Sequence, residues 1–177
     1  MRREISIHLS FLISFFIFIS LFRGWLDVSF WPLWLGGLIG TVLPDLDHLI
    51  YVYFLRPHEL TSQRVERMVR QARLSDFLRL LAETRGERTK LIFHTLFFQL
   101  IFLGLTFLVI TSSASLLGRG LVLAFSLHLL IDQIVNLVEM GSLGNWFGQI
   151  PFSFSEEGTR GYLFLVSLVI LFFGFFL

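Results

Sequence analysis

The feature that most constrains this chain is a series of apolar runs of membrane-spanning length. A transmembrane helix needs about 20 consecutive apolar residues. Five segments meet or approach that length: residues 5–22, 31–55, 91–111, 121–138 and 161–177. The chain is 55% apolar and only 15% charged, which argues against a soluble fold. We therefore expect an all-α integral membrane protein, a single domain over residues 1–177 built as a bundle of about five transmembrane helices.

The second run is interrupted near its middle by Pro44. Proline removes a backbone hydrogen bond inside a helix and commonly kinks it, so we expect a kink in the span over residues 31–55. Irregular backbone at membrane depth is tolerated only where it is buried in protein or lines a wet cavity. Three ionisable residues, Asp45, Asp47 and His48, follow this point directly. The interruption therefore predicts a functional site.

The segment over residues 56–90 indicates the orientation. It carries nine Arg or Lys residues against five acidic ones, and Arg2 and Arg3 precede the first span. Basic residues at span ends favour the cytoplasmic side. We therefore expect a multi-pass protein of the inner (plasma) membrane, with its N-terminus and the charged segment in the cytoplasm and its C-terminus on the far side.

The charged segment also has helical periodicity. Apolar residues recur at spacings of three and four, with arginines between them, which predicts one or two amphipathic helices. The apolar positions are Val65, Met68, Val69, Ala72, Phe77, Leu78 and Leu81. Two interpretations stay open: the apolar face lies in the lipid headgroup region, or it packs against the protein.

Ionisable side chains inside membrane spans are expensive and indicate a functional site by default. Here they come from four different spans: His8, Asp45, Asp47, His48, His94, His128 and Asp132. At 1.5 Å per residue, all of them fall in the cytoplasmic half of the bilayer. Scattered structural residues would have no reason to agree in depth, so we expect these side chains to converge.

Spacing within the spans supports this convergence. His128 and Asp132 stand four residues apart and share a helix face, as do Asp45 and His48 at a spacing of three, whereas Asp47 points away from Asp45. Imidazole and carboxylate together are the usual ligands of Zn²⁺, and also of Mn²⁺ or Fe²⁺. The pattern predicts a divalent metal as cofactor, with zinc as the first choice.

Other interpretations exist for some of these residues. His8 and His94 could hydrogen-bond between helices without binding a metal. Asp47 could satisfy backbone amides that are freed at the kink.

Taken together, the motifs resemble those of the LexA-binding, inner-membrane-associated hydrolase family, also described as membrane-bound metal-dependent hydrolases. The matching elements are an early His8, the run Leu43-Pro44-Asp45-Leu46-Asp47-His48, the pair His94-Thr95, the motif His128-x-x-x-Asp132 and a Gly-rich loop from Gly141 to Pro151. Family members usually carry a second His with an Arg shortly before the His-Ser motif, where this chain has Thr89 and Lys90.

The resemblance implies a metal-dependent hydrolase with distant similarity to zinc-dependent phospholipase C and P1-type nucleases, and hence phosphoester chemistry. Our hypothesis is hydrolysis of a lipid or lipid-linked phosphoester at the cytoplasmic leaflet. The expected metal ligands are His8, Asp45, His94, His128 and Asp132. Asp47 or His48 is the expected general base, or orients a ligand histidine. Arg88 and Lys90 are expected to hold the phosphate.

Two other classes remain possible from the sequence. The same residues could serve a divalent-metal or proton translocator, although the far half of the membrane offers few polar residues for a pathway. A bound metal could also simply staple the helices of a structural protein. The expected partners are membrane lipid and a phosphoester substrate, and no nucleic acid is predicted.

Overall fold

The computed structural model describes residues 2–84, 87–88, 90–151 and 154–177. The described regular elements are all helical, and no strand occurs among them. Four helical segments are long and apolar enough to cross a membrane, namely Ile5–Arg23, Val28–Leu55, Leu116–Met140 and Glu156–Phe176. The chain is therefore an all-α membrane protein, as its sequence predicts. A fifth apolar helix, α6 (Leu96–Ser112), has 17 residues.

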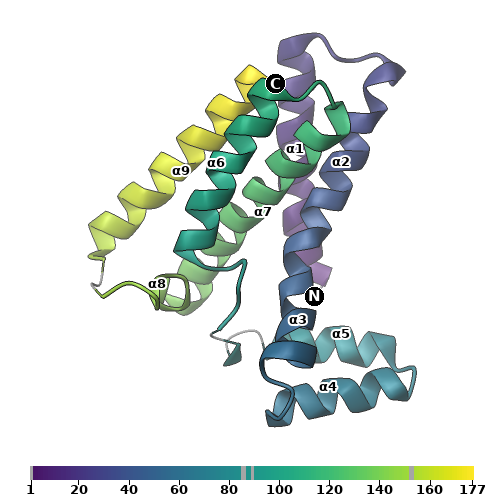
Figure 1. Ribbon diagram of the computed structural model, residues 1–177, viewed down its shortest axis with the longest axis vertical. Helices are drawn as coiled ribbons and strands as arrows, with labels where there is room; N and C mark the ends of the chain where they lie inside the picture. Colours follow the sequence, from purple (N-terminus) through teal and green to yellow (C-terminus); the bar gives the residue numbers. More distant parts are fainter. Residues whose placement is uncertain (1, 85–86, 89, 152–153) are drawn as a thin grey trace.

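The long helices run alternately up and down the bundle (Figure 1). They are α1 (Arg2–Arg23), α2 (Trp31–Val42), α6, α7 (Leu116–Met140) and α9 (Glu156–Phe176). The N-terminus lies towards the end of the bundle that carries α4 (Leu60–Arg70), α5 (Leu74–Glu83) and α8 (Gly144–Phe147), and the C-terminus lies at the opposite end. The end with the N-terminus is also where the ionisable residues gather.

Helix α2 does not continue as a regular α-helix past Val42, two residues before Pro44. It passes into a 3₁₀ turn over Leu43–Asp45, then into α3 (Leu46–Ile50) and a π-helical turn over Tyr51–Leu55. These changes of helical type follow the missing proline N–H. They leave Asp47 and His48 buried and Asp45 exposed.

Short polar residues begin the other long helices. Thr95, Ser115 and Ser155 each accept a hydrogen bond from the backbone N–H three residues ahead, which is the usual N-cap geometry. Before α2, the Asp27 carboxylate accepts the Ser29 N–H at 2.8 Å, and this bond holds the pKa of Asp27 below its ordinary value. Gly141 ends α7 with φ of 70°, a left-handed conformation that glycine adopts easily.

The central helix is α7, which packs against α1, α2, α6 and α9. Its closest neighbour is α2, because glycines remove the side chains between the two backbones. A Cβ added at Gly36 or Gly40 would lie 2.1 Å from the carbonyl oxygen of Leu117 or Leu121, respectively. Such close approach through a Gly-x-x-x-Gly pair is a common way to pack membrane helices.

The charged segment folds into two helices, α4 (Leu60–Arg70) and α5 (Leu74–Glu83), which run across the bundle axis (Figure 1). Their apolar faces meet Val52 in a small separate core that contains Val65, Phe77 and Leu81. Val65 is fully buried there. Of the two open interpretations, the structure shows packing of this face against the protein.

Helix α6 begins at Leu96, five residues after the predicted start of the third span. The preceding residues, from Leu91 to Thr95, are not helical. The backbone N–H groups of Ile92, Phe93 and His94 donate instead to the carboxylate of Asp47.

Candidate metal centre

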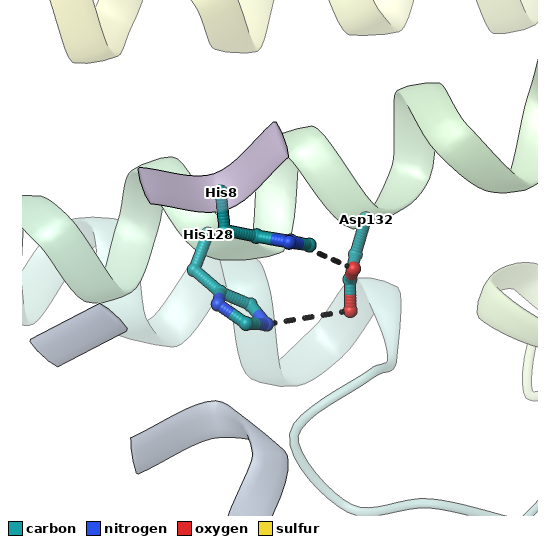
Figure 2. A group of neighbouring side chains, drawn as sticks. All are labelled: His8, His128 and Asp132. Carbon is teal, nitrogen blue, oxygen red and sulfur yellow. Dashed lines mark ion pairs between the residues drawn. The ribbon is translucent and has the colours of Figure 1, made fainter. Parts of the chain in front are cut away.

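The centre of the site is a group of three buried side chains, His8 from α1 and His128 and Asp132 from α7 (Figure 2). One ligand atom from each of them lies within 4.8 Å of the others. His8 Nε2 is 3.0 Å from Asp132 Oδ1, and His128 Nε2 is 3.5 Å from Asp132 Oδ2. The rings of the two histidines stack with their centroids 4.1 Å apart. This group could hold a metal ion.

A third histidine reaches the same carboxylate. His94 Nε2 is 2.9 Å from Asp132 Oδ2, and His94 is 5% exposed. Three imidazoles therefore surround Asp132, from α1, from α7 and from the segment before α6. These side chains therefore come together from separate segments of the chain, as the sequence predicts.

Asp47 holds His94 from the other side. Its Oδ2 lies 3.1 Å from His94 Nδ1. The same carboxylate accepts backbone N–H groups from Ile92 at 3.0 Å, Phe93 at 2.6 Å and His94 at 3.3 Å. Asp47 is fully buried, so it both shapes the chain before α6 and fixes the ring of His94. Such a carboxylate behind a histidine is a common support for metal ligands.

Asp45 differs from the other residues because its side chain is 59% exposed. Its Oδ1 lies 3.7 Å from His128 Nε2, so it borders the buried group. Two neighbouring apolar residues on the same outer surface, Val42 and Leu46, are also exposed, at 61% and 42%. The cluster therefore reaches the surface at Asp45, and the surface around it is apolar.

Two further predicted residues, His48 and Arg88, lie beside this cluster and contact each other. Arg88 is buried and donates from Nε to His48 Nδ1 at 3.1 Å. Its other nitrogens donate to Thr84 Oγ1 at 2.9 Å and to the carbonyl oxygen of Leu81. Arg88 thus connects the end of α5 to α3.

The ring of His48 stacks on His94 with a centroid separation of 5.2 Å. The remaining predicted substrate residue, Lys90, is exposed.

Sequence reasoning missed Trp146, in the short helix α8 (Gly144–Phe147). Its ring is 1% exposed and meets the ring of His94 edge to face at 5.4 Å. It also missed the buried amides of Gln99 and Gln133, which hydrogen-bond each other. Gln133 follows Asp132 directly, and its position inside a span was the available signal.

One further observation supports metal binding by the group of His8, His128 and Asp132. His128 is 3% exposed, yet neither of its ring nitrogens has a hydrogen-bond partner within the described part of the chain. Buried polar nitrogens normally have one. A metal ion held by His8, His128 and Asp132 would supply that partner.

Searches of protein-family profiles, of curated proteins and of solved structures found no match to this chain.

Proposed function

We propose that this protein is a membrane-bound metal-dependent hydrolase that acts on a lipid or lipid-linked phosphoester at the cytoplasmic leaflet of the inner membrane. The observation that carries the proposal is the buried group of His8, His128 and Asp132, which borders an exposed carboxylate, Asp45, on an apolar outer surface. A buried polar cluster of this kind inside apolar helices is expensive to maintain and therefore favours a functional role.

The proposal includes five membrane spans, with α6 as the third and a kink in the second at Pro44. Helix α6 alone reaches about 26 Å, slightly less than the ~30 Å hydrocarbon core. The non-helical residues before it extend this reach, and Asp47 satisfies their N–H groups. Alternating spans then put the N-terminus and the α4–α5 hairpin in the cytoplasm and the C-terminus opposite.

The ligands in this proposal are His8, His94, His128 and Asp132, with Asp45 available at the exposed edge. A bound Zn²⁺, or Mn²⁺ or Fe²⁺, would supply Lewis acidity that polarises a phosphoryl oxygen and activates water. Asp47 orients His94, because its carboxylate is occupied by the ring and three amides.

Arg88 acts in the same way on His48, since its donors are committed inside the protein. Phosphate binding is then left to Lys90, which is exposed.

The exposed side chain of Asp45 supports a lipid as the substrate. It is the most exposed of the predicted ligands, and its neighbours Val42 and Leu46 are exposed apolar residues that would face lipid in the proposed arrangement. A substrate whose chains remain in the bilayer could place its headgroup against this carboxylate without crossing the protein. The motif resemblance to the inner-membrane-associated hydrolases points to the same chemistry.

The test uses the purified full chain in detergent and in lipid nanodiscs. Elemental analysis should find about one equivalent of a divalent metal, and a screen of phospholipids and polyprenyl phosphates should find metal-dependent release of phosphate or of a phosphorylated headgroup. Asp132→Asn should lose both the metal and the turnover, because Asp132 contacts three imidazoles. Asp27→Asn is the matched control and should retain both.

Each contrary result has a clear meaning. A chain without metal, or turnover that survives Asp132→Asn, refutes the proposal. Metal that is retained with no turnover of any lipid favours the structural staple, and metal flux in proteoliposomes favours the translocator.

A further inference from the structure

A second buried polar cluster includes Gln133, the residue that follows Asp132, and contains no histidine or carboxylate. The amides of Gln99 in α6 and Gln133 in α7 form two hydrogen bonds, at 3.1 and 2.7 Å. The hydroxyl of Tyr162 in α9 donates to Gln99 Oε1 and accepts from Gln133 Nε2 at 3.1 Å. Both glutamines are at most 1% exposed. Three helices are thus joined by one closed network.

The position of this network on α7 couples it to the metal centre. Asp132 and Gln133 are consecutive, so their side chains leave the helix about 100° apart. Asp132 faces His8 and His94, while Gln133 faces α6 and α9. A side-chain oxygen about 6 Å from the helix axis moves about 2 Å when the helix rotates by about 20°. A rotation of that size would break the 2.9 Å contact between Asp132 and His94.

We propose that Gln99, Gln133 and Tyr162 are positioning residues that set the rotation of α7 and so hold Asp132 against the imidazoles of the metal centre. Inside the bilayer the amides have no water as an alternative partner, so the network favours one rotation. The part of this inference that is tested by zinc affinity rests on the proposed function. A second readout, the separation of α6 and α7, does not depend on any metal.

The test replaces the whole network by apolar side chains of similar shape, Gln99→Leu, Gln133→Leu and Tyr162→Phe together. Removing all partners at once leaves no buried group unsatisfied and is therefore tolerated far better than a single change. The control, Thr106→Val with Ser126→Ala, removes a hydrogen bond of 2.9 Å between the same two helices that involves none of the three network residues. Tyr162→Phe alone provides a milder variant if the triple variant does not fold.

Zinc affinity is measured by competition with a chelator. Helix separation is measured between spin labels at Ile101→Cys and Val138→Cys, which are exposed positions in a chain without cysteine. The triple variant should bind zinc about 10- to 100-fold more weakly, as is typical when support for a ligand is lost, and should broaden the label distances. The control should change neither.

An unchanged distance distribution in the triple variant overturns the inference, as does an equal loss of zinc affinity in the control. If wild-type protein binds no zinc but the triple variant still broadens the distances, the proposed function fails and the positioning role stands.

Discussion

The contact between α2 and α7 can be tested with one methyl group. In Gly40→Ala the added Cβ would lie 2.1 Å from the carbonyl oxygen of Leu121, whereas ordinary contact begins at 3.4 Å. Both partners are helix backbone and cannot turn aside, so the helices must separate by about 1.3 Å at this point. Overpacking of this kind costs about 1 to 3 kcal/mol, which outweighs the gain of up to about 1 kcal/mol from replacing glycine in a helix.

Gly104→Ala in α6 is the matched control, because a Cβ added there meets no atom within 4 Å. It should be neutral or slightly stabilising. Because both variants gain equally from replacing a helical glycine, they should differ in unfolding free energy by the overpacking cost alone, about 1 to 3 kcal/mol. Unfolding is followed by circular dichroism during titration of mild detergent micelles with dodecyl sulfate. Equal stability of the two variants, within about 0.5 kcal/mol, would refute backbone contact between α2 and α7.

The same substitution should also disturb the candidate metal centre. Asp45 lies just over one turn beyond Gly40 and faces His128 across the contact at 3.7 Å. A separation of about 1.3 Å moves that carboxylate away from the ring. We therefore expect weaker zinc binding in Gly40→Ala than in Gly104→Ala, measured by chelator competition on folded protein.

Three further changes test other parts of the molecule. Asp47→Asn should weaken zinc binding about 10- to 100-fold, since it removes the carboxylate behind His94; an unaltered chelator competition curve would contradict that role. Val65→Ala should destabilise the α4–α5 hairpin by about 1 to 3 kcal/mol, seen as faster trypsin cleavage at its arginines with zinc binding intact. Gly141→Ala should cost about 1 kcal/mol in thermal unfolding, because alanine is strained at a φ of 70°; a stabilised variant would argue against the left-handed turn.

The sequence could predict the long helices, from the length of the apolar runs, and the meeting of the ionisable residues, from their depth in the membrane. Apolar runs of about 20 residues report helices directly, because a bilayer imposes that length. The agreement in depth of His8, His128 and Asp132 predicted that they would meet, since charged groups in lipid must find one another. Neither argument requires knowledge of which helices are neighbours.

What sequence reasoning could not supply was the rotation and spacing of the helices. Gly36 and Gly40 were visible as a Gly-x-x-x-Gly pair, but the pattern does not name its partner helix. The contact of Trp146 with His94 depends on the path of the chain after α7, where the sequence has little periodicity. The periodicity of apolar residues also could not predict that α4 and α5 pack against Val52, because an amphipathic face fits a bilayer or a protein core.

The arrangement around Asp47 explains how a histidine between two carboxylates can remain available as a ligand. Three backbone N–H groups already stabilise the Asp47 carboxylate, so His94 needs to donate only through Nδ1. Its Nε2, which faces Asp132, is then the atom at which an ion could replace a proton. The non-helical segment before α6 therefore presents His94, since residues inside a helix have their amides bonded four residues back and could not offer them to one side chain.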